Sequence, residues 1–204
     1  AKWDTLSTEE KSAALSNMWR NKPIADLYEP GSTFKIITSS IGLEENLVQP
    51  NTENDFHCNR VFHVGDRDIY CWAKTAHGNQ TLTQALQNSC NPAFMQLGQR
   101  IGKQRFYKYL QAFGFFDKTG VRMSGESNSI FYNIDDCHEV ELATMSFGQR
   151  FSITPLQLVT AVSAAVNGGN LMQPRIVSKV VNTDTCVETE LAPVKVRQFI
   201  SEDT

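Results

Sequence analysis

The sequence contains no run of basic residues, and its 19 lysines and arginines are interspersed with 22 acidic residues. The formal net charge is −3, so no part of the chain is predicted to follow a phosphate backbone, and nucleic acid is excluded as an expected partner. No stretch approaches the roughly 18 uninterrupted apolar residues that cross a bilayer, and the first residues lack the pattern of a signal peptide. We expect a soluble chain whose export signal or membrane anchor lies outside it.

Cysteines are few, and their number is odd. Five lie scattered over 204 residues, a length at which a domain does not need covalent cross-links, so a full disulfide framework is not expected. Hydrophobic residues make up 41% of the chain and charged residues 20%, as in one globular domain with a substantial core. The cysteines are Cys58, Cys71, Cys90, Cys137 and Cys186.

Apolar residues three or four apart predict a mainly helical chain. Ser7 and Thr8 supply hydroxyls that cap the free N–H groups of a first helix. Further helices are predicted over 32–43, 82–88, 93–101, 104–113, 139–147 and 154–167, and β-branched residues predict strands over 175–181 and 194–200. Residues 50–80 hold asparagine, aspartate, histidine, cysteine and glycine with only short apolar stretches, which predicts a looped insertion with one small hairpin.

Ser32 and Lys35 form an S-x-x-K pattern. Residues three apart on a helix share a face, so a lysine that burial keeps neutral can take the proton of the serine hydroxyl. A serine at a helix start also lies near the positive end of the helix dipole, which favours a developing oxyanion. By itself, this spacing is also typical of a solvated helix face.

The segment around Ser32 is far more specific. Residues 28–35 read Tyr-Glu-Pro-Gly-Ser-Thr-Phe-Lys, and the Pro-Gly pair gives the sharp turn that places a serine at a helix N-terminus. Here the chain resembles the class B penicillin-binding proteins, whose first motif is commonly embedded in this phrase. The resemblance covers essentially the whole chain and is closest to the elongation or stage V sporulation type, with a clostridial character.

The resemblance implies a second motif, S-x-N, which Ser89 and Asn91 supply on a turn between helices. In the family, this serine relays protons to the leaving amine and this asparagine bonds the amide backbone of the substrate. A plainer reading is a polar turn in which Asn91 and Pro92 begin the next helix. The family reading makes Ser32, Lys35, Ser89 and Asn91 the catalytic residues and assigns substrate binding to the last two.

The implied fold is α+β, the penicillin-binding and serine β-lactamase-like transpeptidase fold, with residues 1–204 forming mostly its helical lobe. The third family motif, K-T-G, is spelled by residues 118–120, but these come well before the position of the true motif, which follows segments like 146–149 and 154–157. We therefore expect the C-terminal K-T-G strand and the preceding strands to be missing. An incomplete central sheet then leaves the isolated chain inactive.

The implied activity is that of a peptidoglycan D,D-transpeptidase, which forms a serine acyl-enzyme with D-Ala-D-Ala stem peptides and is acylated by β-lactams. The implied setting is the extracytoplasmic face of the bacterial membrane, with an anchored parent protein and a glycosyltransferase partner. One alternative is a β-lactam sensor or β-lactamase of the same superfamily. Another is a non-catalytic, zinc-stapled module that binds cell wall.

The insertion over 50–80 is dense in metal-ligating residues. Cys58, Cys71 and His77, with Asp55 or His57, can form a four-coordinate zinc site, and the spacing of Asp55 from Cys58 favours Asp55. Some members of the resembling family bind zinc at a similar Cys, Cys-Trp and His-Gly pattern. Alternatives are a disulfide between Cys58 and Cys71 or unpaired loop residues. We interpret Cys90, inside the second motif, as a small buried side chain.

Overall fold

The structure is a computed structural model that describes residues 3–204. Its helices are η1 (Trp3–Thr5), α1 (Thr8–Trp19), α2 (Lys22–Ala25), η2 (Gly31–Phe34), α3 (Lys35–Glu44), α4 (Leu82–Gln87), α5 (Asn91–Ile101), α6 (Lys103–Ala112), α7 (Glu139–Met145) and α8 (Pro155–Ala165). Its strands are β1 (Phe56–Cys58), β2 (Val61–Val64), β3 (Arg67–Tyr70), β4 (Gly78–Gln80), β5 (Asn170–Met172), β6 (Lys179–Val181), β7 (Glu188–Glu190) and β8 (Lys195–Gln198). In residues 3–204 no helix is long and apolar enough to cross a membrane.

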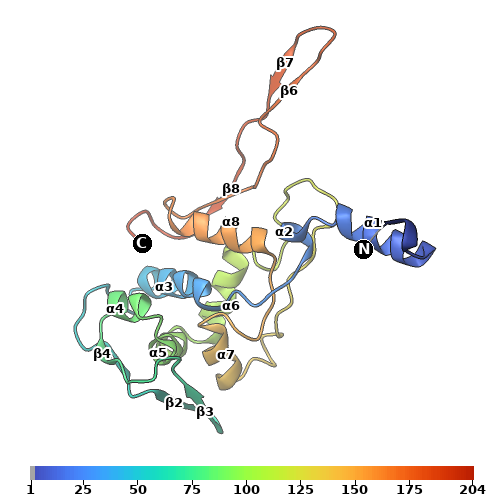
Figure 1. Ribbon diagram of the computed structural model, residues 1–204. Coiled ribbons are helices and arrows are strands. Elements are labelled where there is room, and N and C mark those ends of the chain that lie inside the picture. The colour runs from blue at the N-terminus through green and yellow to red at the C-terminus, as the bar shows by residue number, and fades with distance from the viewer. Residues whose placement is uncertain (1–2) are drawn as a thin grey trace.

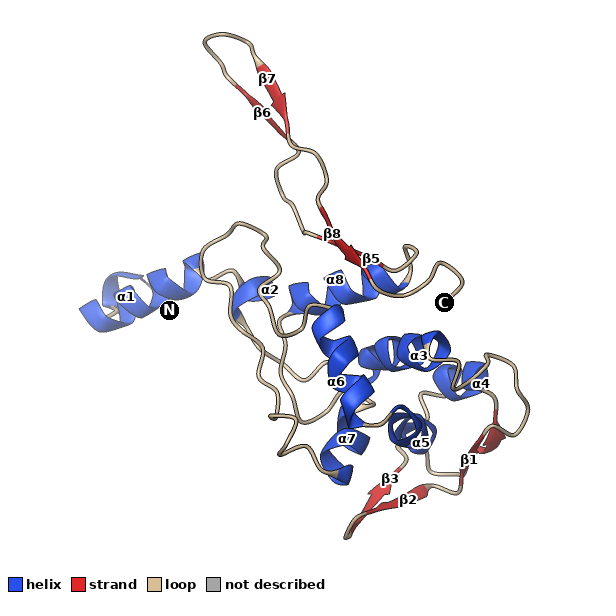
Figure 2. Ribbon diagram, turned by 180° about the vertical axis from the view of Figure 1, so that it is seen from behind, coloured by secondary structure: helices blue, strands red, loops and turns tan. Residues whose placement is uncertain are grey.

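The helices form the body of the molecule, and the strands lie around its periphery (Figures 1 and 2). Within residues 3–204 the strands form four two-stranded antiparallel sheets, β1–β4, β2–β3, β5–β8 and β6–β7. Helix α3 contacts both α5 and α8, and α5 also contacts α7. The α+β class and the predominance of helices are as predicted.

An aromatic core lies directly beneath the start of α3. Phe34 is fully buried, and its ring meets Phe151 edge-on at 4.7 Å and Phe115 at 5.5 Å between centroids. Such tilted contacts are the favoured geometry for aromatic pairs. The residue two positions after Ser32 is thereby anchored in the core, which fixes the first turn of the helix.

The predicted helix starts are confirmed by their caps. Ser7 and Thr154 each accept a hydrogen bond from the third residue of the following helix in a reciprocal capping box, and Pro155 occupies the first turn of α8. Thr81 caps α4 in the same way. These interactions satisfy N–H groups that have no partner within the helix.

The insertion over 50–80 contains two small sheets, whereas the sequence predicted one hairpin. β2 and β3 form that hairpin, and β4 returns to pair with β1, so that Cys58 lies opposite Gly78. The second pairing joins segments twenty residues apart and has no local turn signature. It brings the two ends of the insertion together beside α5, which β1 contacts.

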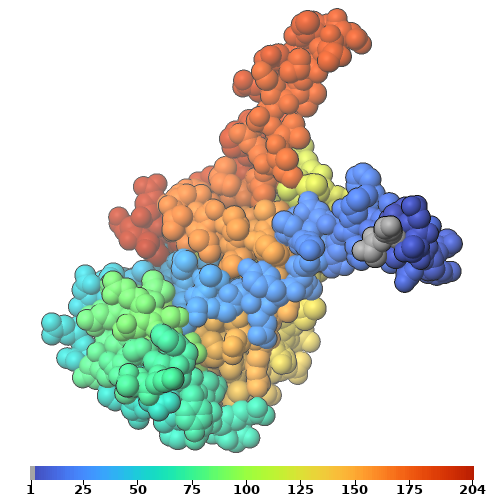
Figure 3. Space-filling model, in the orientation of Figure 1, coloured from blue at the N-terminus to red at the C-terminus, as the bar shows by residue number. Residues whose placement is uncertain are grey.

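The C-terminal part of the chain carries a hairpin that stands away from the body (Figure 3). β6 and β7 form this hairpin, and all of their residues are exposed. The predicted strand over 175–181 shortens to Lys179–Val181, and that over 194–200 to Lys195–Gln198. β6 is fully exposed, so no buried face extends it, whereas β8 pairs with β5 beside α8 and is followed by Ile200, which is buried in the core.

Candidate functional site

Ser32 lies in a 3-10 turn at the entrance to α3. Gly31 has a φ of +58°, a left-handed conformation that glycine adopts without a steric penalty. Gly31 and Ser32 belong to η2, and α3 follows at Lys35 without a break. The turn places the Ser32 hydroxyl and the Lys35 amine on the same side of the chain, as the three-residue spacing predicts.

Lys35 is the centre of a polar cluster. Its side chain is fully buried, and Nζ lies 3.2 Å from Ser32 Oγ, 2.9 Å from Ser89 Oγ, 2.8 Å from the Ser89 carbonyl oxygen and 2.8 Å from Asn91 Oδ1. An ammonium has three N–H donors for these four acceptors, whereas a neutral amine has two donors and a lone pair. The neutral form can therefore accept the Ser32 proton while still donating to two of the other three acceptors.

Ser89 completes the cluster from a strained turn. Its φ is +48°, unusual for a residue with a side chain, and it links α4 to α5. Its hydroxyl donates to Ser32 Oγ at 2.9 Å. The structure thus brings together all four residues that the sequence singled out as catalytic, from segments more than fifty residues apart.

The environment of Lys35 favours the neutral amine. Burial lowers the pKa of Lys35 to about 8, and the nearby thiols of Cys90 and Cys71 oppose that shift. The Phe94 ring lies 5.4 Å from Nζ and forms part of the apolar surroundings. A lysine with this pKa is partly unprotonated near neutrality, as a general base requires.

Residues 148–153 are hydrogen-bonded to the segment that precedes Ser32. Gly31 N–H donates to the Gly148 carbonyl at 2.8 Å, and Arg150 N–H donates to Glu29 at 2.9 Å. Tyr28 pairs with Ile153 through two backbone hydrogen bonds of 3.1 Å. Residues 148–150 therefore lie against the residues just before the serine.

A cluster of three cysteines and one histidine lies beside the second motif. The ligand atoms of Cys58, Cys71, His77 and Cys90 all lie within 4.8 Å of one another. His77 Nδ1 is 3.7 Å from Cys58 Sγ and 3.6 Å from Cys71 Sγ. In a tetrahedral zinc site with ordinary bond lengths, a sulfur and a nitrogen ligand are separated by about 3.6 Å. The donor set and its spacing therefore fit zinc.

Asp55, predicted as the fourth metal ligand, is not part of this cluster. Its carboxylate pairs with Arg100 at 2.6 Å, and the Arg100 guanidinium lies over the Phe56 ring. Cys90 occupies the fourth position instead. Arg100 lies 45 positions further along the chain, so its attraction for Asp55 could not be found from local spacing, whereas a third cysteine beside Ser89 was a signal that the sequence already offered.

The thiols of the cluster differ in acidity. Burial raises the pKa of Cys58, but hydrogen bonds from the backbone of His77 and Arg60 outweigh it, and the pKa falls below its usual value. Burial raises the pKa of Cys90 to about 12, and contacts from the Gln80 side chain and the Ala93 backbone only partly offset this. Cys90 therefore ionises readily only if a cation is nearby.

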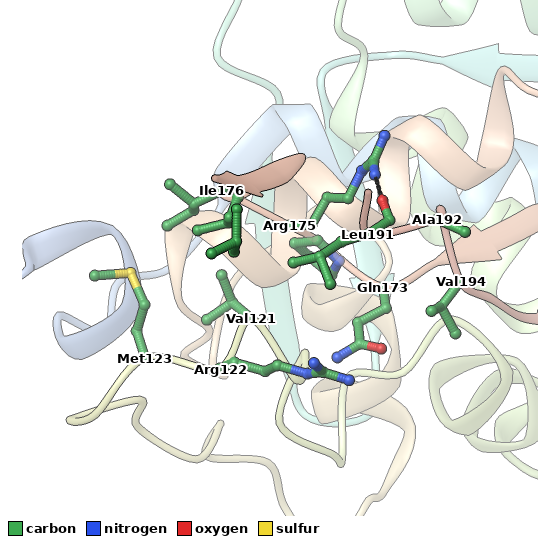
Figure 4. Close-up of a pocket in the computed structure, with 12 residues that line it drawn as sticks. Val121, Arg122, Met123, Gln173, Arg175, Ile176, Leu191, Ala192 and Val194 are labelled. Atoms are coloured by element: carbon green, nitrogen blue, oxygen red, sulfur yellow. Dashed lines mark hydrogen bonds between the residues drawn. The ribbon is translucent and has the colours of Figure 1, made fainter. Parts of the chain in front are cut away.

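Two other features lie outside the cluster. Residues 118–120 form no strand, and the Thr119 hydroxyl donates to Glu126, as expected if this K-T-G is not the family's third motif. A cavity of about 490 Å³ lies at the base of the β6–β7 hairpin (Figure 4). Its walls are mainly aliphatic, with Arg122 and Arg175 as its charged residues, so it lacks the groups for nucleophilic chemistry.

Comparison with known proteins agrees with the resemblance. The family model for the penicillin-binding protein transpeptidase domain matches residues 4–204. Stage V sporulation protein D of Bacillus subtilis is 44% identical over 188 residues, which cover 91% of this chain and 29% of that protein. Penicillin-binding protein PbpB of Mycolicibacterium smegmatis is 30% identical, over 90% of this chain and 28% of that protein. The chain thus spans less than a third of these relatives.

Solved structures give the same picture. Penicillin-binding protein 3 from Mycobacterium tuberculosis, complexed with aztreonam, superposes with a TM-score of 0.80 at 29% identity, over 90% of this chain and 40% of that one. The D,D-transpeptidase domain of a peptidoglycan glycosyltransferase from Eggerthella lenta gives a TM-score of 0.84 at 24% identity, over 95% of this chain and 52% of that one. The second likeness concerns the fold alone.

Proposed function

Because the chain belongs to the penicillin-binding protein transpeptidase family, we propose that it is the part of a peptidoglycan D,D-transpeptidase that carries the nucleophile. Ser32 attacks the penultimate D-Ala carbonyl of a stem peptide, and the terminal D-Ala leaves as an ester to Ser32 forms. An amine of a neighbouring stem peptide then takes the acyl group and frees the serine. A β-lactam reacts as the donor does and stalls at the ester.

The observation that carries this proposal is the position of Lys35 Nζ, within hydrogen-bonding distance of Ser32, Ser89 and Asn91. Lys35 acts as the general base that takes the Ser32 proton. The Ser89 hydroxyl is hydrogen-bonded to both Lys35 Nζ and Ser32 Oγ, so it can pass a proton to the leaving amine. Asn91 keeps its amide N–H groups for the substrate backbone, and the helix dipole at Ser32 favours negative charge on the attacked carbonyl.

A fluorescent penicillin tests the acyl-enzyme on the full-length protein. We expect labelling to disappear in Ser32→Ala and to persist in Ser40→Ala, which removes a hydroxyl of α3 that donates to Ile36 O. Labelling that survives in Ser32→Ala would overturn the assignment of the nucleophile. Rapid loss of label by hydrolysis would favour the β-lactamase alternative, and a wild-type protein that never labels would favour the binding module.

We also propose a structural zinc ion held by Cys58, Cys71, His77 and Cys90. The ion would cross-link the insertion to the second motif, and four protein ligands leave no position for a reacting water. The zinc content of the full-length protein, and the melting temperature before and after chelation, test this. A Cys58–Cys71 disulfide is the competing outcome, and a count of free thiols in the denatured protein separates the two.

The setting that we propose is the outer face of a bacterial membrane, with an anchor supplied by the parent protein and a glycosyltransferase as partner. Its support is the naming of the relatives as penicillin-binding proteins and peptidoglycan D,D-transpeptidases. The 44% identity to a sporulation protein favours a role in spore formation over one in division. Spore yield and heat resistance after deletion of the gene test that role.

A further inference from the structure

Gln80 lies between the metal-ligand cluster and the turn that carries Ser89. It is the last residue of β4, and its side chain is 2% exposed. Gln80 Oε1 accepts a hydrogen bond of 2.9 Å from Asn88 Nδ2. Asn88 closes α4 and immediately precedes Ser89, so this end of the amide fixes the beginning of the catalytic turn.

The Nε2 group of the Gln80 amide is buried and lacks a hydrogen-bond acceptor within residues 3–204. Burial raises the pKa of Cys90, and the Gln80 side chain nevertheless partly offsets this rise, as a donor close to that sulfur does. A buried N–H without an acceptor is unfavourable and rare. An acceptor that Gln80 Nε2 gains when a metal ion is bound would satisfy it. A neutral thiol is a weak acceptor, whereas a metal-bound thiolate is a strong one.

We propose that Gln80 is a positioning residue that donates from Nε2 to the Cys90 thiolate when the metal is bound, and thereby couples metal binding to the placement of Ser89 and Asn91. This inference rests on the zinc site proposed above. Hydrogen bonds to metal ligands orient those ligands and tune their affinity. Here the ligand is itself the middle residue of the catalytic motif, and the same amide holds the residue that precedes the motif.

Zinc affinity and a cobalt spectrum of the full-length protein test this coupling. We expect Gln80→Met to bind zinc about 10- to 100-fold more weakly in competition with a chromophoric chelator, because the Cys90 thiolate loses its donor. The thiolate-to-cobalt charge-transfer band of the Co²⁺ form should shift as well, which a purely structural change would not cause. At low zinc, penicillin acylation should slow, and saturating zinc should restore most of it.

Gln87→Met is the matched control, since Gln87 is exposed on the adjacent helix α4 and should leave both readouts unchanged. Asn88→Ala removes only the other contact of Gln80, so it should slow acylation without moving the cobalt band. If Gln80→Met does not fold, Gln80→Asn withdraws the amide by one methylene and should shift the band in the same way.

Three results discriminate the possibilities. A wild-type affinity and an unshifted band in a folded Gln80 variant would overturn the role of Gln80 and leave the zinc site standing. A wild-type protein that binds neither zinc nor cobalt would overturn the zinc site and this inference with it. A loss of affinity that also appears in Gln87→Met would show that the effect does not pass through Cys90.

Discussion

Gly148 lies so close to Gly31 that a Cβ atom on Gly148 would be 2.0 Å from the Gly31 carbonyl oxygen. The two glycines are also joined by the hydrogen bond from Gly31 N–H to the Gly148 carbonyl at 2.8 Å. No real Cβ atom approaches backbone so closely, so any side chain at Gly148 must displace the peptide that precedes Ser32. The position of the segment after α7 therefore determines where the peptide before Ser32 lies.

Gly148→Ala should slow the acylation of Ser32 by about 10-fold or more, since a displacement on the order of 1 Å at the reacting group costs up to about 100-fold in rate. The rate constant for penicillin acylation in stopped-flow fluorescence measures this. Gly125→Ala is the matched control, because Gly125 has a similar φ of +86° but open space around its Cβ position, against +88° at Gly148. Equal effects of the two substitutions would mean that backbone strain, and not the contact with Gly31, is responsible.

The acylation rate should depend on pH through Lys35. Burial lowers the pKa of Lys35 to about 8, and only the neutral amine can take the Ser32 proton. Below that pKa the neutral fraction falls tenfold per pH unit, so the second-order rate constant should rise with pH, reach half its maximum near the pKa, and level off above it. A rate that is flat from about pH 6 to about pH 9 would contradict the role of a lysine base with this pKa.

Asp55→Asn should leave the zinc content unchanged and lower stability by about 1 kcal/mol, because it weakens a partly buried, charge-assisted bond to Arg100. Metal analysis and urea unfolding measure the two effects. Asp26→Asn provides the comparison, since the Asp26–Arg20 pair has the same 2.6 Å separation but lies in solvent, and its loss should change stability by less than about 0.5 kcal/mol. Loss of zinc in Asp55→Asn would restore Asp55 as a ligand.

Features that depend on residues close together in the sequence could be predicted, whereas contacts between distant segments could not. The capping boxes at Ser7 and Thr154, the helix that follows Ser32, and the turn at Ser89 depend on neighbours within a few positions, and each was predicted. The polar cluster at Lys35 spans more than fifty positions, and only the resemblance to a family made it visible in advance.

Long-range contacts account for what the sequence did not predict. The pairing of β1 with β4 and the ion pair between Asp55 and Arg100 join segments that no local pattern connects. Asp55 was favoured as a ligand because it lies near Cys58 in the sequence, yet the Arg100 guanidinium, 45 positions away, pairs with its carboxylate instead. Cys90 was interpreted as a small buried side chain, which describes its burial but not its three neighbours in the cluster.

Cys90→Ser tests whether the second motif contributes a metal ligand. The substitution keeps the side-chain size but replaces a thiolate with a hydroxyl that zinc binds poorly, so zinc affinity should fall by at least about 100-fold. Cys137→Ser is the matched control, because Cys137 is also a buried free thiol, 1% exposed against 0% for Cys90, and stands outside the cluster. Zinc should dissociate from the first variant alone, and its melting temperature should then become insensitive to chelator. If both variants lost zinc equally, general disturbance of the core would explain the result; if neither did, Cys58, Cys71 and His77 would hold the ion without Cys90.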